Sequence, residues 1–404
     1  MKKDIQILII PDVHGRTFWK DAVEAHSDVP TVFLGDYLDQ YAQEKITDKE
    51  AMDVFMYILA HKAAHPDSVH LLLGNHDMAY IDQRFGCGRH KYLDEDVVGR
   101  VYRDRIDLFE LAFDAEVGGK RFLFTHAGVT KGWLSCHRRL FADGLSAKAF
   151  SDLWHGPKRR NEAFLDALTD VSILRWGQSK FGSPLWADLQ ETMGDKLCAD
   201  GVVQVFGHSQ QDVEPACLKD RAYCLDCRRV FYIDSQGDVR DYITDKVVGD
   251  SRYIFLDIDG VMTSWRTGYW FDPECFARLG RILDRTGADI VITSSWKGLD
   301  VKETIGYLTD TKDPHVGEHP FPFADRIVGI TRDWPVVDDD YTRGKEIDVY
   351  LKHHSCSSYV IIDDVQDFLP EQQPCFVHTR DSVGLDDADT ERSIKILLGD
   401  VLPV

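Results

Sequence analysis

The chain of 404 residues is long enough for two domains and carries a formal net charge of −21 at pH 7. This acidity argues against a protein that coats nucleic acid, because such a protein needs a basic surface. A membrane span is not expected, because no run of about 18 apolar residues occurs. The nine cysteines are an odd number scattered along the chain, which predicts free thiols and a cytoplasmic location.

Five apolar segments of the N-terminal half each end in polar residues. We expect them to be buried strands, and they span residues 5–10, 31–34, 69–73, 122–124 and 202–206. The first runs directly into Pro11 and Asp12, so it is a strand rather than the apolar part of a signal peptide. A helix is expected over residues 49–61. Ligand sites gather at the carboxyl edge of such α/β sheets, so the five strand ends should converge.

The residues at these five ends suit a pair of metal ions. The candidate ligands are Asp12, His14, Asp36, Asn75, His126 and His208. Asp12 and His14 are expected at the first ion, Asp36 has two oxygens that can bridge both ions, and the remaining three complete the second. Mixed carboxylate, imidazole and amide ligands favour Mn, Fe or Zn. Two such ions activate a shared water and clamp a phosphoryl group.

The stretch Gly74-Asn75-His76-Asp77, expected to be a loop after its strand, adds catalytic groups. His76 is the candidate acid that protonates the leaving oxygen, and Asp77 is the candidate that orients its imidazole. A single histidine is more often a core residue, and a single Asp39 would be a capping residue. Six ligand-type residues at five successive strand ends favour the metal site instead.

The N-terminal half resembles the calcineurin-like metallophosphoesterases, whose five motifs match, in order, Asp12-x-His14, Gly35-Asp36-x-x-Asp39, Gly74-Asn75-His76-Asp77, His126 and Gly207-His208. Its single late histidine is similar to the branch of phosphoprotein phosphatases and bis(nucleosyl)-tetraphosphatases. The resemblance implies a metallophosphoesterase-type αββα sandwich over residues 1–248, with two divalent metals.

Two positions depart from that branch. Gln40 stands where the branch usually has an arginine, and we expect Arg16 to replace this phosphate-binding group. Gln210 stands where many other metallophosphoesterases have a second histidine, so the first metal is expected to keep three protein ligands plus water. Arg175 lies in a stretch that resembles the substrate cleft of the family. It is a candidate phosphate ligand, and an ordinary surface arginine is an equally good interpretation.

Cys224 and Cys227 form a CxxC pair, with Cys217 upstream. A zinc knuckle needs a second ligand pair at suitable spacing, and the sequence has none. We therefore interpret these cysteines as structural.

The same pattern of strands that end in acids restarts after a short polar stretch, residues 245–251. Apolar segments are followed by Asp257-Ile258-Asp259-Gly260, by Thr293-Ser294 and by Asp363-Asp364, and a further strand is expected at 376–377. Helices are expected over residues 274–285 and 345–352. This alternation predicts a second, doubly wound α/β domain over residues 249–404.

Two aspartates separated by one residue suit aspartyl-phosphate chemistry. Asp257 is the candidate nucleophile, and Asp259 lies on the same side to protonate the leaving group. Thr293 or Ser294 is expected to donate hydrogen bonds to the transferring phosphoryl group, and Lys345 to supply positive charge there. The candidate Mg²⁺ ligands are Asp363 and Asp364, together with the nucleophile.

These elements resemble motifs I to IV of the haloacid-dehalogenase-like phosphatases, which implies a Rossmann-like domain. In detail, Arg343-Gly344-Lys345-Glu346 and Ile361-Ile362-Asp363-Asp364 are similar to the phosphatase domain of multi-domain RNA-repair proteins. No large cap fits between Asp257 and Thr293. A small lid within residues 298–342, with a solvated acidic loop at residues 338–340, would leave a cleft open to bulky phosphorylated ends.

The leading hypothesis is a bifunctional phosphohydrolase that acts on 2′,3′-cyclic or 3′-phosphate ends of RNA or DNA. A nucleotide or dinucleoside-polyphosphate phosphatase is the first alternative. A serine/threonine-type protein phosphatase is a second, weakened by Gln40. An alternative of another class is that one of the two domains is a non-catalytic binding module.

Overall fold

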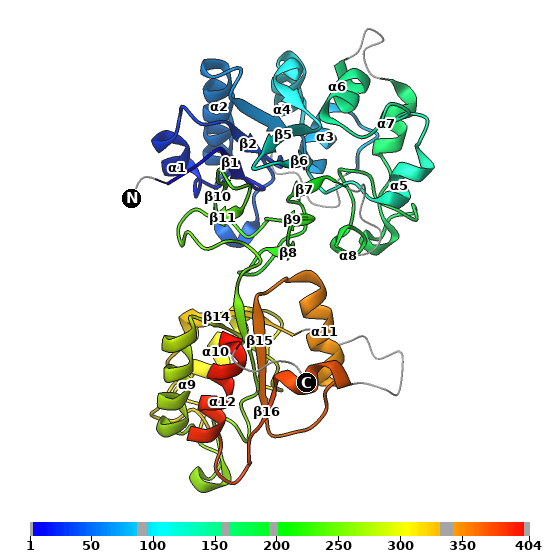
Figure 1. Cartoon of the computed structure of the whole chain (residues 1–404). Helices are drawn as coiled ribbons and strands as arrows, with labels where there is room; N and C mark the ends of the chain where they lie inside the picture. The colour runs from blue at the N-terminus through cyan, green and yellow to red at the C-terminus, as the bar shows by residue number, and fades with distance from the viewer. Residues whose placement is uncertain (1–2, 87–94, 156–160, 194–200, 332–341, 400–404) are drawn as a thin grey trace. The chain divides into compact units, whose positions relative to one another are not determined.

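The structure is a computed structural model that describes residues 3–86, 95–155, 161–193, 201–331 and 342–399. The expected acidic loop at residues 338–340 and part of the expected lid lie outside these ranges. The chain divides into two compact units, shown in Figure 1. Unit 1 comprises Met1–Gln211 and Pro215–Val248, and unit 2 comprises Asp212–Glu214 and Gly249–Val404. Within the described residues, no helix is long and apolar enough to cross a membrane.

Unit 1 contains two sheets. The first has the order β11-β10-β1-β2-β3-β4, and β1 to β4 run parallel. Its strands are β1 (Ile7–Ile10), β2 (Thr31–Phe33), β3 (Val69–Leu72), β4 (Phe109–Glu110), β10 (Phe231–Ile233) and β11 (Val239–Asp241). The second has the order β5-β6-β7-β9-β8. Its strands are β5 (Phe113–Val117), β6 (Lys120–Phe124), β7 (Val203–Phe206), β8 (Ala216–Leu218) and β9 (Ala222–Cys224).

Residues of the first sheet alternate between two cores. Ile7 and Ile9 pack with Phe124 of the second sheet, whereas Leu8 and Ile10 belong to the core beneath the helices. The helices are α1 (Lys20–Ala25), α2 (Asp48–Ala64), α3 (Asn75–Ile81), α4 (Glu95–Asp104), α5 (Lys131–Cys136), α6 (Ala147–His155), α7 (Glu162–Leu168) and α8 (Leu189–Thr192). Because both faces of the sheet are covered, its central strands are mainly apolar, although β3 carries His70, and the candidate site residues lie where the strands end.

All five expected strands of this half are present, as β1, β2, β3, β6 and β7, and the expected helix is α2. Helix α2 begins with a capping box between Thr47 and Glu50. The stretch after β3 differs from the expectation of a loop. Gly74 is the N-cap of α3, so Asn75, His76 and Asp77 form the first turn of a helix.

Unit 2 has one parallel sheet with the order β14-β13-β12-β15-β16. Its strands are β12 (Arg252–Leu256), β13 (Asp289–Ile292), β14 (Ile327–Ile330), β15 (Ser358–Asp363) and β16 (Phe376–His378). The chain leaves β12 toward β13 and β14, then crosses to β15 and β16 on the other side. The strand order therefore reverses at β12, and ligands bind at such a point outside the carboxyl ends of the strands.

Helices cover both faces of this sheet, as expected for a doubly wound domain. They are α9 (Pro273–Thr286), α10 (Val301–Thr309), α11 (Arg343–His353) and α12 (Asp387–Leu398). Ile254 and Leu256 pack with α9, α10 and α12, whereas Tyr253 and Phe255 pack with α11. Short 3₁₀ turns occur at η1 (Ala42–Glu44), η2 (Ile106–Leu108), η3 (Ile173–Arg175), η4 (Trp265–Thr267), η5 (Ala324–Arg326) and η6 (Pro370–Cys375).

Candidate metal and phosphoryl-transfer sites

Five of the six candidate ligands of unit 1 form two groups whose ligand atoms lie within 4.8 Å of one another. These groups are Asp12, His14 and Asp36, and Asp36, His126 and His208. Asp36 belongs to both, as expected of a bridging carboxylate. Its Oδ2 lies 3.7 Å from His14 Nε2 and 3.5 Å from His126 Nε2. The ends of β1, β2, β6 and β7 thus bring these side chains together.

Asn75, the sixth candidate, lies in the same cluster. Its Oδ1 is 2.9 Å from His126 Nε2, which in turn is 3.1 Å from His208 Nδ1. The other ring nitrogen of His126 and that of His14 donate to the carbonyls of Leu34 and Leu38, both at 2.8 Å. A carbonyl only accepts, so these bonds keep the proton on Nδ1 and turn each Nε2 toward the cluster.

The electrostatics of this cluster fit divalent cations. Burial raises the pKa of Asp12 to about 6, against the opposing effect of His126. Burial also lowers the pKa of His126, and burial with the charge of Arg175 lowers that of His208 well below its usual range. The charge of Arg16 lowers the pKa of Asp12 only as a minor effect, and bound metal ions would supply further positive charge to these buried carboxylates.

The backbone is strained where these ligands lie. Four residues other than glycine have positive φ at the site: His14 at 45°, Asp36 at 51°, Asp39 at 63° and His208 at 65°. Such conformations cost of order 1 kcal/mol or more and persist where the surrounding structure over-determines them. Their concentration here indicates that the backbone is bent in order to aim side chains.

Two glycines let the backbone approach the carboxylates. A Cβ at Gly74 would collide with Asp36 Oδ1, and a Cβ at Gly207 would collide with Asp12 Oδ1. The same carboxylates accept backbone hydrogen bonds at these places, from His76 N–H at 3.0 Å and from His208 N–H at 3.0 Å. Glycine is therefore required at both positions by space.

His76 is oriented by a different carboxylate from the one expected. Its Nδ1 lies 2.8 Å from Asp39 Oδ2, and the hydroxyl of Tyr80 donates to the other Asp39 oxygen at 2.5 Å. Asp77 instead accepts the backbone N–H groups of its neighbours and the hydroxyl of Tyr102. The expectation for Asp77 is corrected, because the first turn of α3 points its carboxylate back at the backbone.

The two arginines expected at phosphate lie near this cluster. Arg16 is buried, its Nε donates to Glu44 at 2.8 Å, and its Nη2 has no hydrogen-bond partner among the described residues. Arg175 donates to the hydroxyl of Ser209, next to His208 in sequence. Gln40 is turned away from a phosphate-binding role, because its amide donates to Asp48 at 2.7 Å. A buried donor without a partner makes Arg16 the stronger candidate for phosphate.

Asp226 is a buried acid of this site that the sequence interpretation missed. Burial, and next the negative charge of Asp12, raise its pKa well above the usual range. It follows β9 in the same way as the predicted ligands follow their strands, but the sequence interpretation considered only the flanking CxxC pair, which it assigned a structural role. Cys224 donates to backbone carbonyls, and in the described part of the chain no cysteine belongs to a potential metal group.

Unit 2 gathers its predicted acids at the carboxyl ends of β12 and β15. Asp257, Asp363 and Asp364 have ligand atoms within 4.8 Å of one another. Burial, and next the charge of Asp257, raise the pKa of Asp363 to about 7. Three carboxylates this close repel one another when ionised, so the set fits a divalent cation with oxygen ligands.

Arg343, which was not predicted, is the cation paired with this cluster. Its Nη1 lies 2.8 Å from Asp257 Oδ2 and 2.5 Å from Asp363 Oδ2. Lys345 lies one half-turn further into α11, where its backbone N–H is capped by Thr342. The sequence signal was available, since Arg343 is the first residue of the Arg343-Gly344-Lys345-Glu346 stretch.

The remaining predicted groups surround Asp257. Asp257 Oδ1 and Thr293 Oγ1 are buried and have no hydrogen-bond partner within the described ranges. The Ser294 hydroxyl accepts the backbone N–H of Trp296. The indole of Trp296 donates to Asp259 Oδ2 at 3.1 Å. The nucleophile candidate and the Thr293 hydroxyl therefore each present an unused polar atom, as expected where a phosphoryl group binds.

Comparisons with known proteins agree with this division of chemistry. The family model described as calcineurin-like phosphoesterase matches residues 5–212, and the model described as HAD domain in Swiss Army Knife RNA repair proteins matches residues 253–390. Serine/threonine-protein phosphatase 7 of Arabidopsis thaliana is 28% identical over 131 residues, which are 30% of this chain and 30% of that protein. The match thus spans about a third of that relative.

A solved protein serine/threonine phosphatase from Saccharomyces cerevisiae, with similarity to human phosphatase PP5, is also similar to this chain. It has 16% identity and a TM-score of 0.36, with 57% of this chain and 73% of that chain covered.

Asp39 and Asp77 should have separable effects. Asp39→Asn removes the charge beside His76, so we expect turnover of bis-p-nitrophenyl phosphate to fall about 10- to 100-fold. Asp77→Asn places amide hydrogens against four buried donors, whereas Asp39→Asn faces two, so we expect Asp77→Asn to lower the melting temperature more and to affect turnover less. A loss of turnover in Asp77→Asn with an unchanged melting temperature, while Asp39→Asn stays active, would contradict these roles.

Arg343 should matter more than Lys345 for the chemistry of unit 2. Arg343→Ala removes the cation beside Asp257, and we expect phosphate release by this unit to fall about 100-fold or more. Arg343→Lys should recover part of it, because one charge returns without the guanidinium geometry. Lys345→Ala is the comparison, measured on the same monoester. If phosphate release falls more in Lys345→Ala than in Arg343→Ala, Lys345 rather than Arg343 supplies the positive charge.

The stabilising effect of divalent ions should increase with pH. The folded-state pKa values of Asp12, Asp77 and Asp363 are about 6, 7 and 7, above the ordinary 3.8. Without metal, the stability from their protonated forms is complete below about pH 4 and is lost as pH rises through 6–7. Melting temperatures with chelator, and with Mn²⁺ and Mg²⁺, should therefore differ more at pH 7.5 than at pH 5.5. An equal difference at both pH values would refute the assignment.

Proposed function

We propose that this chain, which belongs to the calcineurin-like phosphoesterases and also carries an HAD domain, is a bifunctional phosphohydrolase that heals broken nucleic-acid ends. The first domain, which we propose to span residues 1–248, would open 2′,3′-cyclic phosphates. The second domain, proposed to span residues 249–404, would remove the remaining 3′-phosphate. The observation that supports the proposal is that one chain contains two separate clusters of possible metal ligands, one of carboxylates with imidazoles and one of carboxylates alone.

In unit 1, the chain supplies ligands, an acid and phosphate-binding groups. Asp12, His14 and Asp36 would hold one ion, and Asp36, Asn75, His126 and His208 the other. When bound, two divalent ions such as Mn, Fe or Zn activate water and neutralise the phosphoryl charge. His76, held by Asp39 at 2.8 Å, would give its proton to the leaving oxygen. Arg16 would direct its unpaired Nη2 toward a phosphate oxygen.

In unit 2, the nucleophile is a carboxylate. Asp257 Oδ1 would attack phosphorus, and the bond from phosphorus to the ester oxygen would break as Asp259 protonates that oxygen. Water deprotonated by Asp259 would then hydrolyse the acyl phosphate, which restores Asp257 and releases inorganic phosphate. Arg343 and the Thr293 hydroxyl would stabilise the phosphoryl oxygens. Asp363, Asp364 and Asp257 would hold Mg²⁺, which when bound offsets the charge of the substrate.

The two activities suit consecutive steps on one substrate. Opening a cyclic phosphodiester leaves a monoester, and a monoester is the substrate of an aspartyl phosphatase. The HAD model that matches unit 2 is described from RNA repair proteins, which supports ends of RNA as the substrate. Hydrolysis of phosphoproteins is a second candidate function, favoured by the similarity to a serine/threonine-protein phosphatase. The diversion of Gln40 to Asp48 weakens it.

The test uses the full chain with Mn²⁺ and Mg²⁺ and RNA oligonucleotides that end in a 2′,3′-cyclic phosphate or a 3′-phosphate. We expect His76→Ala to leave the cyclic end intact and Asp257→Asn to accumulate the monoester, each about 100-fold slower in its own step. Loss of both steps in one variant alone would make the other unit a binding module. Efficient release from nucleotides or phosphopeptides, with none from any oligonucleotide, would refute end healing.

A further inference from the structure

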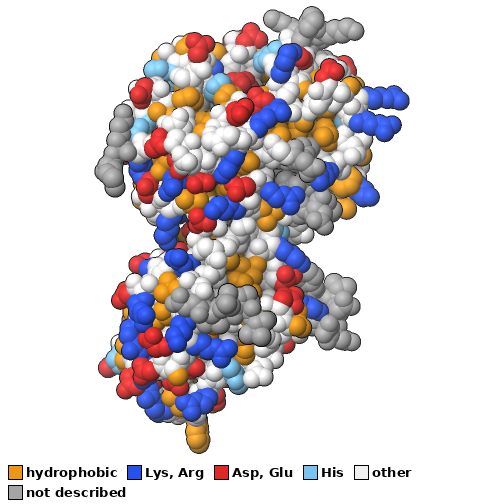
Figure 2. All heavy atoms as spheres, viewed as in Figure 1, with side chains coloured by type: hydrophobic (Ala, Val, Ile, Leu, Met, Phe, Trp, Pro, Cys, Tyr) orange, Lys and Arg blue, Asp and Glu red, His pale blue; other side chains and the backbone are white. Residues whose placement is uncertain are grey.

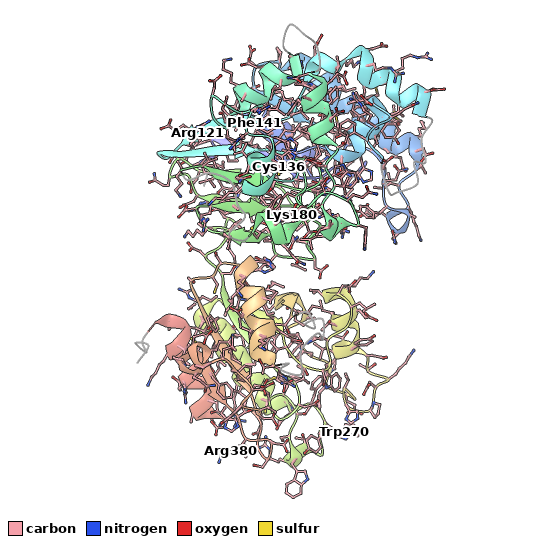
Figure 3. All side chains as sticks on the ribbon, turned by 90° about the vertical axis from the view of Figure 1, so that its right-hand side faces the viewer. Arg121, Cys136, Phe141, Lys180, Trp270 and Arg380 are labelled. Atoms are coloured by element: carbon pink, nitrogen blue, oxygen red, sulfur yellow. The ribbon has the colours of Figure 1, made fainter. Side chains whose placement is uncertain are left out.

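Three aromatic side chains of unit 2 are exposed within one short segment, residues 264–271, which follows the Asp257 loop. The exposed fractions are 73% for Trp265, 38% for Tyr269 and 51% for Trp270. We call these three residues the aromatic shelf. Hydrophobic side chains project from one end of unit 2 in Figure 2, and Trp270 is labelled at that end in Figure 3, together with Arg380.

The segment that carries the shelf is held in one conformation. Thr263 and Phe271 form an antiparallel bridge at its base, and the backbone N–H of Tyr269 donates to the Ser264 carbonyl at 2.9 Å. Tyr269 itself has a φ of 64°, which is an unfavourable conformation for tyrosine. A well-bonded loop that keeps aromatic rings in water has not exposed them through disorder. The rings are presented at the expense of burial.

The shelf lies beside the reacting groups of unit 2. The hydroxyl of Tyr269 donates to Asp381 at 3.0 Å, and the backbone N–H of Trp265 donates to the Asp381 carbonyl at 2.9 Å. Just before the segment, the Thr263 hydroxyl donates to Asp259 Oδ1 at 3.4 Å, and the Thr379 hydroxyl, two residues before Asp381, donates to the Gly260 carbonyl at 2.9 Å. These bonds join the segment and its Asp381 partner to the loop that carries Asp257 and Asp259.

A second chain of contacts links the segment to Asp259. The indole of Trp296 donates to Asp259, and its ring packs on Phe271 at the base of the segment, 5.6 Å between centroids. Trp270 is supported from behind, since Gly317 lies where a Cβ would come within 2.9 Å of its ring. One side of Trp270 is therefore covered by the protein. Its exposure of 51% leaves the other side for a ligand.

The charges around the shelf favour stacking over attraction to a polyanion. Arg266, inside the segment, pairs with Asp272 and Glu274, and Arg380 pairs with Asp386 at 2.9 Å. These arginines are already neutralised by carboxylates. Polar residues separate Trp265 from Tyr269, so the segment does not form the continuous apolar patch of a protein interface. Flat rings of this kind suit the face of a nucleobase, which stacks without sequence preference.

We propose that the aromatic shelf binds the nucleobase adjacent to the phosphate that Asp257 attacks. The shelf would hold the base by stacking on Trp265 and Trp270, while the phosphate enters among Asp257, Thr293 and Arg343. The inference rests on the proposed function in that it names the substrate chemistry of the same site. A nucleobase beside a phosphate occurs both at a nucleic-acid end and in a free nucleotide, and the experiment distinguishes the two sources.

The test measures phosphate release by the His76→Ala chain. In this variant unit 1 is inactivated, so the released phosphate comes from the reaction at Asp257. The substrates are a 3′-phosphorylated oligonucleotide, the same oligonucleotide with an abasic terminal nucleotide, 3′-AMP, and β-glycerophosphate. We expect Trp265→Ala with Trp270→Ala to raise KM about tenfold or more for base-bearing substrates, at unchanged kcat. Abasic and glycerol esters should be unaffected, and Trp265→Phe should keep most of the affinity. The affinity should depend only weakly on salt.

Tyr307→Ala is the matched control, because this exposed tyrosine lies on α10 and its hydroxyl donates to Glu303 of the same helix at 2.6 Å. Binding of 3′-AMP to the Asp257→Asn chain, followed by tryptophan fluorescence, repeats the comparison without turnover. The proposed role of the shelf is contradicted if the double variant raises KM equally for abasic and base-bearing substrates, or does not raise KM at all. Base-dependent turnover of 3′-AMP without turnover of the oligonucleotide would keep the shelf and overturn end healing. Turnover of glycerol phosphate alone would overturn both.

Discussion

The carboxylate of Asp36 connects every part of the first site. Its Oδ1 accepts the backbone N–H of His76, and its Oδ2 faces the imidazoles of His14 and His126. Its own backbone N–H donates to Asp77 at 2.8 Å. The strained φ of Asp36 and the absence of a side chain at Gly74 both serve this one position. A buried carboxylate that faces two imidazoles in this way is placed to bridge two cations.

The two sites meet the same electrostatic problem in different ways. In unit 1 burial lowers the pKa of His126 and His208 and Arg16 offsets part of the charge of Asp12, so bound metal ions would supply the further positive charge. In unit 2 the Arg343 guanidinium is already in place against Asp257 and Asp363, so part of the charge is built into the chain. This difference agrees with the nucleophiles we propose. A hydroxide needs strong activation, whereas a carboxylate needs only to stay ionised near neutral pH.

The chemistry of both units depends on strands that are buried on both faces. Such strands cannot carry polar side chains along their length, so those groups are placed at the strand ends. Asp226 follows the same rule after β9, which makes it a further buried acid beside Asp12. The aromatic shelf is an exception of another kind. It lies on a loop beyond the sheet, where no periodicity of strand or helix governs its side chains.

The α/β class, the strands that carry the site residues and the residue types at their ends could be predicted from the sequence, because apolar runs and their polar ends are local features. The order of strands in the sheets, and strands such as β4, β5 and β14, could not. The candidate ligands Asp12, Asp36 and His126 were identified in this way. Their assigned roles depend on distances that the sequence does not encode locally. Only the tertiary structure decided that Asp39 rather than Asp77 orients His76, and that Arg343 contacts the nucleophile. These pairs join distant segments, and their geometry follows from positive φ angles, from the direction of the first helical turn and from side-chain reach.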